Sequence, residues 1–193
     1  SIGGTTPSPA RFRPVRRDCD VPVNVLIRPR FGDLLYSDME LEEMLDRAVR
    51  EVTEQTAGVR LQPGGELLGK DLCTVHISFR RGFRTSLTLC ADTALLARMA
   101  RNALGEEALT DQDLEDFGKE YFNILCGKIA AVLFQNTKVP ARFSVPAFYR
   151  GRYAPENHQA QFMLTYANEH QEGAQLTHHV PRSGEDGADR NEI

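Results

Sequence analysis

The sequence predicts an α+β domain in which one mostly antiparallel sheet is covered on one face by a long helix and two other helices. Residues 73–79 and 83–89 alternate apolar and polar side chains on either side of a short turn, as in a β-hairpin. Residues 114–134 form the longest helical pattern, with two shorter helical patterns before it and further strand patterns after it. Strands grouped in hairpins, with helices collected between them, are typical of this class.

The composition is that of an ordinary globular domain. Of 193 residues, 41% are hydrophobic and 26% are charged, which is enough for one well-buried core. No run approaches the 18 or so apolar residues of a membrane helix, so no membrane partner is expected. Ser1 begins the chain and no apolar leader follows it. We expect a cytoplasmic protein.

The first 32 residues differ from the rest of the chain. They have linker-like ends and carry six arginines against two aspartates, whereas the whole chain has a net charge of −4. This stretch is either a polyanion-binding segment or a solvated linker with a basic bias, although residues 21–27 hold a weak strand pattern. We favour the linker and expect no nucleic-acid partner. The predicted organisation is a flexible basic arm (1–32), one domain (33–181) and a disordered polar tail (182–193).

The four cysteines are Cys19, Cys73, Cys90 and Cys126, and no two of them form a Cys-x-x-Cys pair. The last three lie within predicted strands or the long helix, where a small apolar side chain fits. We therefore predict buried free thiols, in keeping with a reducing compartment.

The first helix begins at a capping box formed by Ser37 and Glu40 and ends at Gly58. A strand starts at 59–61 and turns at the Pro-Gly-Gly of 63–65. In the hairpin that follows, His76 lies on the polar face of the first strand, so we expect its side chain to be exposed.

The second helix is predicted to have Asp92 as its N-cap, Leu104 on its buried side and Gly105 as its end. Thr110 and Asp113 form a second capping box, which opens the long helix.

Three strands are predicted after the long helix. Residues 142–151 form the first, and Pro146 within it marks an edge, a bulge or an end. A strand through 162–166 and a last one from 174 to 180 follow, separated by a turn at Glu172-Gly173.

The long helix has two distinct faces. At about 100° per residue, its apolar side chains share one broad arc (Leu114, Phe117, Tyr121, Leu125, Ile129, Val132 and Leu133). Glu120, Asn123 and Gly127 lie on the opposite side, within about 60° of one another. An acid, an amide and a residue without a side chain are therefore predicted to share the face that points away from the core.

Other kinds of site have little support in the sequence. No glycine-rich phosphate loop has the required strand-to-helix setting. His170, His178 and His179 are the only candidate metal ligands, but neighbouring strand residues point to opposite faces and no acid or cysteine has ligand spacing. No Ser-His-Asp or Cys-His pair has a local signature.

The pattern Glu120-x-x-Asn123-x-x-x-Gly127 in a long helix resembles the signature of the CheX-like chemotaxis phosphatases, relatives of CheC and FliY. The setting agrees, because in that family a hairpin and a shorter helix ending in a glycine-bearing turn precede the signature helix. A strand of the type Phe-Ser-x-Pro with a later glycine follows it, as at 143–146 and Gly151 here. The resemblance covers roughly residues 35–180 and implies the α+β fold predicted above.

The resemblance also implies a function in two-component signalling: hydrolysis of phospho-aspartate on a CheY-like response-regulator receiver domain. Asn123 would orient the attacking water and Glu120 would anchor to the receiver's lysine. Gly127, Ala130 and Ala131 would keep the helix surface low for docking. Mg²⁺ would come from the receiver, with no cofactor held by this chain, and a homodimer that pairs sheet edges is expected.

The sequence departs from the family pattern at Lys119, which stands between Gly118 and Glu120. Lys119 lies about 40° from Asn123, where it would contact phosphate or repel the receiver's lysine. Tyr121 and Phe122 are bulkier than usual, and core packing is the expected role of both. A catalytically inactive module that binds a receiver or another signalling protein therefore remains an alternative.

Overall fold

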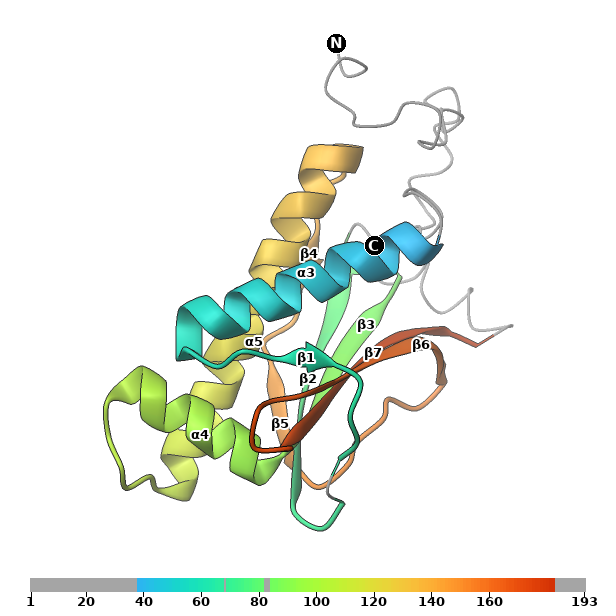
Figure 1. Ribbon diagram of the computed structural model, residues 1–193. Helices are drawn as coiled ribbons and strands as arrows, with labels where there is room; N and C mark the ends of the chain where they lie inside the picture. The colour runs from blue at the N-terminus through green and yellow to red at the C-terminus, as the bar shows by residue number, and fades with distance from the viewer. Residues whose placement is uncertain (1–37, 68, 82–83, 183–193) are drawn as a thin grey trace, which may run out of the picture.

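The structure is a computed structural model that describes residues 38–67, 69–81 and 84–182. The predicted basic arm, its strand at 21–27 and all but the first residue of the predicted tail lie outside these ranges. The described residues form the predicted α+β fold: an antiparallel seven-stranded sheet with three helices on one face (Figure 1). In chain order the elements are α3 (Asp38–Ala57), β1 (Gln62–Pro63), β2 (Leu72–Arg81), β3 (Ser86–Asp92), α4 (Thr93–Leu104), α5 (Asp111–Thr137), β4 (Arg142–Phe143), β5 (Ala147–Arg150), β6 (His158–Ala167) and β7 (Gly173–Pro181).

The sheet is built from two hairpins placed side by side. Its strand order is β1-β6-β7-β3-β2-β4, and β5 also pairs with β2. Val75 lies opposite Leu89 in the β2–β3 hairpin, and Leu89 lies opposite Leu176 of β7, so these apolar side chains share one face. The expected hairpin and the two expected C-terminal strands are confirmed.

The three helices cover this apolar face, and the core lies between the two layers. The largest fully buried side chains come from both layers: Tyr121, Tyr166, Phe122, Leu41, Leu45, Ile77, Leu87, Leu95 and Leu96. Helix α3 crosses α5 (Figure 1), and in the contact between them the hydroxyls of Thr53 and Tyr121 are 2.6 Å apart. The expected packing role of Tyr121 and Phe122 is confirmed.

The end of α3 agrees with the sequence prediction, whereas α4 departs from it at the Asp92 side chain and at Leu104. Gly58 has a φ of +66° and its N–H donates to the Glu54 carbonyl, which ends α3. Asp92 is the N-cap residue of α4, as predicted, but its side chain makes no capping hydrogen bond. Instead its Oδ2 accepts a hydrogen bond from the Gly173 N–H at 2.7 Å and so joins β3 to β7. Leu104 is exposed, because it lies in the last turn of α4, beyond the contact with the core.

Helix α5 begins as predicted, at a capping box: the Asp113 N–H donates to the Thr110 hydroxyl oxygen, and the Thr110 N–H donates to the Asp113 carboxylate. Gly118 lets this helix approach the sheet closely: a Cβ there would lie 3.3 Å from the Phe148 ring and 3.4 Å from Leu96. This close approach fixes the distance between α5 and the edge of the sheet formed by β4 and β5.

The single strand predicted at 142–151 is two strands, β4 and β5, separated by residues 144–146. Both pair with β2, and the register shifts between Phe79 and Arg81. Pro146 has no N–H to donate, so the ladder is interrupted there. Of the possibilities that the sequence left open at Pro146, the structure shows a break in the strand.

The face of the sheet opposite the helices is also covered. The segment between β5 and β6 lies against β2: the Thr74 hydroxyl donates to the Gly151 carbonyl, and the Tyr153 ring lies edge-on to His76 with centroids 5.4 Å apart. His76 is only 8% exposed, so the prediction that it is exposed is wrong. The period-2 pattern indicates which side chains share a face, but not that a distant loop covers it.

Two further findings concern the described residues. Cys73, Cys90 and Cys126 are buried free thiols, as predicted, and Cys19 lies outside the described ranges. Across 38–67, 69–81 and 84–182, no helix has the length and apolar character needed to cross a membrane.

Candidate functional site

A shallow groove of about 400 Å³ runs between α5 and the segment that joins β4 to β5. Its helix side carries Lys119, Glu120 and Asn123, three of the residues predicted from the sequence. Both sides together are lined by Asp116, Lys119, Glu120, Asn123, Phe143, Ser144, Val145 and Pro146. The structure therefore brings the polar face of the long helix and the Phe-Ser-x-Pro segment into one site.

Glu120 and Asn123 are both exposed and lie one turn apart on α5. In the described part of the chain, no hydrogen bond or ion pair restrains either side chain. The helix beneath them is fixed by buried Tyr121 and Phe122. A carboxylate and an amide are thus presented to the groove on a rigid support, with their polar groups available to a partner.

Lys119 is held by a neighbour on its own helix. Its Nζ lies 2.8 Å from the Glu115 carboxylate one turn earlier, and both side chains are only about one-third exposed. The sequence left open whether Lys119 would contact phosphate or repel a lysine. In the structure its charge is balanced within the helix, which weakens both effects.

Asp116 is a member of the site that the sequence analysis missed. It is exposed, lies one turn before Glu120 and lines the same groove. Its Oδ1 accepts a hydrogen bond from the Gln112 side chain at 2.8 Å. Its spacing of four residues from Glu120 was the available signal, because residues i and i+4 share a helix face.

The opposite side of the groove is held firmly against β2. The Ser144 N–H donates to the Ser78 carbonyl at 2.8 Å, and the Ser78 N–H donates to the Ser144 hydroxyl oxygen at 3.0 Å. Beside it the rings of Phe143 and Phe79 pack edge-on, with centroids 5.7 Å apart. The wall of the groove is therefore preorganised, like its helix side.

The three small residues predicted to help docking lie further along α5. Gly127 faces open space, since a Cβ there would meet no atom within 4 Å. Ala131 is exposed one turn later, on the same side as Asn123, whereas Ala130 is half-buried against the core. The helix surface beyond Asn123 is thus low at Gly127 and Ala131.

The arrangement suits chemistry in which a reactant is positioned rather than covalently attacked. An amide both donates and accepts hydrogen bonds and needs no particular protonation state. A carboxylate nearby offers an anchor for a cation on a partner. The groove is open and shallow, which fits the approach of a protein surface better than the enclosure of a small molecule.

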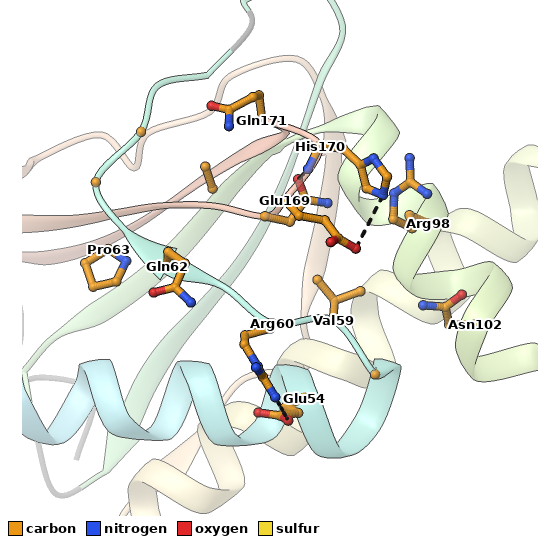
Figure 2. A pocket seen from close by; sticks show the side chains of 15 residues that line it. Glu54, Val59, Arg60, Gln62, Pro63, Arg98, Asn102, Glu169, His170 and Gln171 are labelled. Carbon is orange, nitrogen blue, oxygen red and sulfur yellow. Dashed lines mark hydrogen bonds and ion pairs between the residues drawn. The ribbon is translucent and has the colours of Figure 1, made fainter.

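A larger depression lies elsewhere, where the end of α3, α4 and the β6–β7 turn meet (Figure 2). It measures about 840 Å³, but its charged side chains already pair with one another. The Arg60 and Glu54 side chains are 3.4 Å apart, and those of His170 and Glu169 are 3.7 Å apart. Arg98 donates two hydrogen bonds to the Glu172 carboxylate, of 2.9 and 3.0 Å. Since its charges are matched internally, we do not take this depression as the functional site.

The histidines considered as metal ligands are not brought together. His178 packs on the Phe162 ring, on the helix side of the sheet, while His179 lies on the other face beside Thr88. His170 is in the turn between β6 and β7. Among the residues that the structure describes, no three His, Cys, Asp or Glu side chains are grouped as metal ligands.

A known family matches the part of the chain that holds the groove. Residues 73–166 match the family profile described as "Chemotaxis phosphatase CheX". This part of the chain is therefore similar to the CheX family.

Solved structures share the fold. A chemotaxis protein CheX from Desulfovibrio desulfuricans aligns with a TM-score of 0.57 at 17% identity, over 72% of this chain and 97% of that one. CheX from Vibrio vulnificus gives 0.57 at 15% identity, over 70% and 93%. A CheX–CheY–BeF₃–Mg²⁺ complex from Borrelia burgdorferi gives 0.54 at 15% identity, over 73% and 97%.

The amino-terminal third of the chain resembles a different family. Residues 1–67 match the CutC family profile. The human copper homeostasis protein cutC homolog is 54% identical over 44 residues, which is 23% of this chain and 16% of that protein. A CutC family protein of Salmonella paratyphi B is 48% identical over 52 residues, 26% of this chain and 21% of that one. This chain therefore spans a minor part of its curated relatives, and the sequence analysis missed this resemblance.

Proposed function

We propose that this protein is a phosphatase that accelerates hydrolysis of phospho-aspartate on a CheY-like receiver domain. The observation that carries the proposal is the pair Glu120 and Asn123, both exposed in one preformed groove and both without a partner in the described residues. The similar fold of the CheX in complex with CheY supports a receiver as the partner. A cytoplasmic location is part of the same proposal.

Asn123 is proposed to position the attacking water. An acyl phosphate is already activated, so the barrier falls mainly by holding a water in line with the phosphorus. The amide oxygen accepts a hydrogen bond from the water while the amide nitrogen donates to a phosphoryl oxygen. Because the core fixes the α5 backbone, little conformational entropy is lost when the partner docks.

Glu120 is proposed to anchor the helix by pairing with the lysine of the receiver's phosphorylation site. Mg²⁺ held by the receiver would balance phosphoryl charge, and this chain would hold no cofactor of its own. Lys119 does not oppose this contact strongly while it is paired with Glu115 at 2.8 Å.

The experiment is to follow loss of phosphate from purified receiver domains of the same genome, each phosphorylated with acetyl phosphate in the presence of Mg²⁺. Wild type should accelerate the decay for at least one receiver, and Asn123→Ala should lower this acceleration by about 100-fold, as expected for loss of a positioning group. Gln135→Ala, an exposed amide on the same helix outside the groove, is the matched control. Equal decay with wild type and Asn123→Ala would disprove the catalytic role.

The second candidate is a non-enzymatic module that binds a receiver through the same groove. Lys119 favours it, because a cation beside Glu120 and Asn123 departs from the family pattern. This candidate requires saturable binding that Glu120→Ala weakens, with no faster loss of phosphate at any protein concentration.

We also propose a homodimer formed through sheet edges. In the described residues β1 pairs with β6 only at Tyr166 and Ala167, and the Gly64 N–H donates to the Thr165 carbonyl, so the outer edge of β6 from 158 to 164 has no strand partner there. Such an edge is a ready template for pairing with another copy. Sedimentation equilibrium at micromolar concentration should give twice the chain mass, and a monomer would contradict the proposal.

A further inference from the structure

Three of the large exposed apolar side chains lie on the two segments that form the groove. Among the described residues five are more than 40% exposed: Leu104 (49%), Ile124 (41%), Phe134 (46%), Val145 (83%) and Met163 (47%). Val145 lines the groove, and Ile124 and Phe134 lie on α5 next to or beyond it. Leu104 and Met163 lie on α4 and β6, away from the groove. Exposing an apolar side chain to water is unfavourable in free energy, and a partner surface that covers the side chain removes this penalty.

Val145 is held out rigidly. Ser144 before it is tied to Ser78 by two hydrogen bonds of 2.8 and 3.0 Å. After it, Pro146 has a fixed φ and Ala147 pairs with His76 in the sheet. Val145 itself is β-branched and has few side-chain conformations. Little conformational entropy is therefore lost when a partner covers it, which favours tight contact.

The second apolar group continues the polar face of α5. In helical projection Phe134 and Ala131 lie within about 40° of Glu120, as do Ile124 and the open Gly127. Lys138 sits over the Phe134 ring at 5.7 Å, so the ring is held at the end of this stripe. The face thus runs from acidic at Asp116 and Glu120 to apolar at its carboxyl end.

We propose that Val145 on one side and Ile124 with Phe134 on the other are the residues that select the partner receiver. This inference rests on the proposed function and identifies the surface by which the phosphorylated domain is recognised. The acidic centre, Asp116 and Glu120, is complementary to a lysine and a bound Mg²⁺ on the partner. The partner is a receiver domain with apolar side chains on both sides of its phosphorylation site.

The inference separates two kinds of residue by their kinetics. Asn123 would act on the phosphoryl group and affect kcat. Val145, Ile124 and Phe134 would contact the partner outside the reacting atoms and affect KM, because binding lost equally from the ground and transition states leaves kcat unchanged.

The test measures kcat and KM with the phosphorylated receiver that wild type dephosphorylates fastest. Val145→Ser and Phe134→Ser should each raise KM about tenfold with kcat within twofold, the effect of losing one buried apolar contact. Val145→Ile should retain most of the affinity. Leu104→Ser removes an apolar group about as exposed as Phe134 from α4, away from the groove, and should leave both constants unchanged. Circular dichroism and thermal unfolding check that each variant folds.

Three results would overturn the inference. One is an unchanged KM in Val145→Ser and Phe134→Ser while Asn123→Ala abolishes activity, which leaves the proposed function intact. Another is a rise in KM of the same size in the Leu104→Ser control. The third is a dimer that Val145→Ser converts to monomers, which would assign this surface to a second copy. If no receiver is dephosphorylated or bound, the proposed function fails together with it.

Discussion

Gly127 is a residue that the fold does not require but that a docking partner could use. A methyl group at this position would meet no atom within 4 Å, so the fold itself does not require glycine. Glycine in a helix interior costs up to about 1 kcal/mol relative to alanine. A residue that lowers helix stability without helping to pack the core is consistent with use by a partner at close range.

Gly127→Ala should therefore stabilise the protein by about 0.5–1 kcal/mol while leaving the core unchanged. If the partner approaches closely here, Gly127→Leu should raise the KM for the phosphorylated receiver without a loss of stability. Chemical denaturation measures the first effect and steady-state dephosphorylation the second. An unchanged KM in the leucine variant would show that Gly127 lies outside the docked surface.

The pair formed by Lys119 and Glu115 controls the charge beside the groove. Removing the partner carboxylate in Glu115→Gln frees the ammonium group, which should repel the receiver's lysine and raise KM about threefold at low salt. The double variant Glu115→Gln/Lys119→Gln should restore the wild-type value. Stability should change by less than about 0.5 kcal/mol, because both side chains are partly solvated. A single variant with normal KM at low salt would show that Lys119 does not face the receiver's lysine.

At the scale of elements, α5 is positioned by α3 as well as by the sheet. The Thr53 hydroxyl donates to the Val49 carbonyl at 2.6 Å and lies 2.6 Å from the Tyr121 hydroxyl, so Tyr121 is the donor to Thr53. Burial raises the pKa of Tyr121 to about 12, and the phenol keeps its proton at physiological pH. This bond is made inside the core, one residue from Glu120.

Tyr121→Phe should lower the free energy of unfolding by about 1 kcal/mol, because Thr53 keeps its bond to Val49 and only one neutral hydrogen bond is lost. Activity at saturating substrate should stay within twofold if the sheet contact alone fixes α5. Urea denaturation and kcat of the same preparation test the two statements. A large fall in kcat without a matching loss of stability would show that α3 positions the catalytic face.

Local signals in the sequence predicted the elements well, and long-range contacts account for the errors. The Thr110–Asp113 box and the apolar arc of α5 depend on residues within a few positions, so they could be predicted. Asp92 was correctly placed at the N-cap of α4, but its side-chain partner, the Gly173 N–H, is 81 residues away and could not be predicted. Pro146 indicated locally that the strand at 142–151 would be irregular, but the hydrogen bonds between Ser144 and Ser78 of β2 could not be predicted.

The same distinction applies to the site. Glu120 and Asn123 could be found because one helix carries both. Ser144 and Val145 could be linked to them only through a family resemblance, since they reach the groove by pairing of β4 and β5 with β2. Asp116 was within reach of the helical pattern and was overlooked. A site made by one element is easier to predict than the wall that a second element adds.

At the scale of the whole molecule, the two family matches do not correspond to two folded units. The CutC match ends at residue 67 and the CheX match begins at 73, yet α3 lies in the former and packs with the latter. Leu41, Leu45 and Val49 of α3 are all at most 1% exposed and belong to the common core. The segment from α3 to β1 is therefore part of the CheX-like domain structurally, whatever its sequence resembles.

The histidines on the sheet face opposite the helices tie the stability of the whole molecule to pH. The pKa of His76 and of His179 is lowered to about 4, mainly by burial and in smaller part by the charge of neighbouring histidines: His158 acts on His76, and His76 and His158 act on His179. His76 Nε2 lies 3.1 Å from the Ser78 hydroxyl, and His179 Nε2 lies 3.0 Å from that of Thr88. Tyr153 packs on His76, and in the described residues no hydrogen bond or ion pair joins a carboxylate to either ring. Both imidazoles are therefore neutral in the folded protein.

Unfolding exposes both rings, whose pKa then returns to about 6.5. Between pH 6.5 and 4 the unfolded chain binds more protons than the folded one, so stability falls as the pH falls through this window and levels off below it. Each histidine alone would lower the free energy of unfolding by up to roughly 3 kcal/mol across the window. The two together would lower it by less than twice that amount, because the two rings interact. Arg98 holds the pKa of Glu172 below its usual range, so protonation of Glu172 lowers the stability of the fold only at the acid end of this pH window.

Urea denaturation followed by circular dichroism from pH 7.5 to 4.5 measures this dependence. Wild type should lose a few kcal/mol over the range, and His179→Gln should lose clearly less, because glutamine can retain a bond to Thr88 but cannot take up a proton. His170→Gln replaces an exposed histidine and should reproduce the wild-type slope. The slope is compared rather than the absolute stability, so a variant that is less stable at pH 7.5 still gives an answer. Parallel slopes in wild type and His179→Gln would show that other groups cause the acid sensitivity.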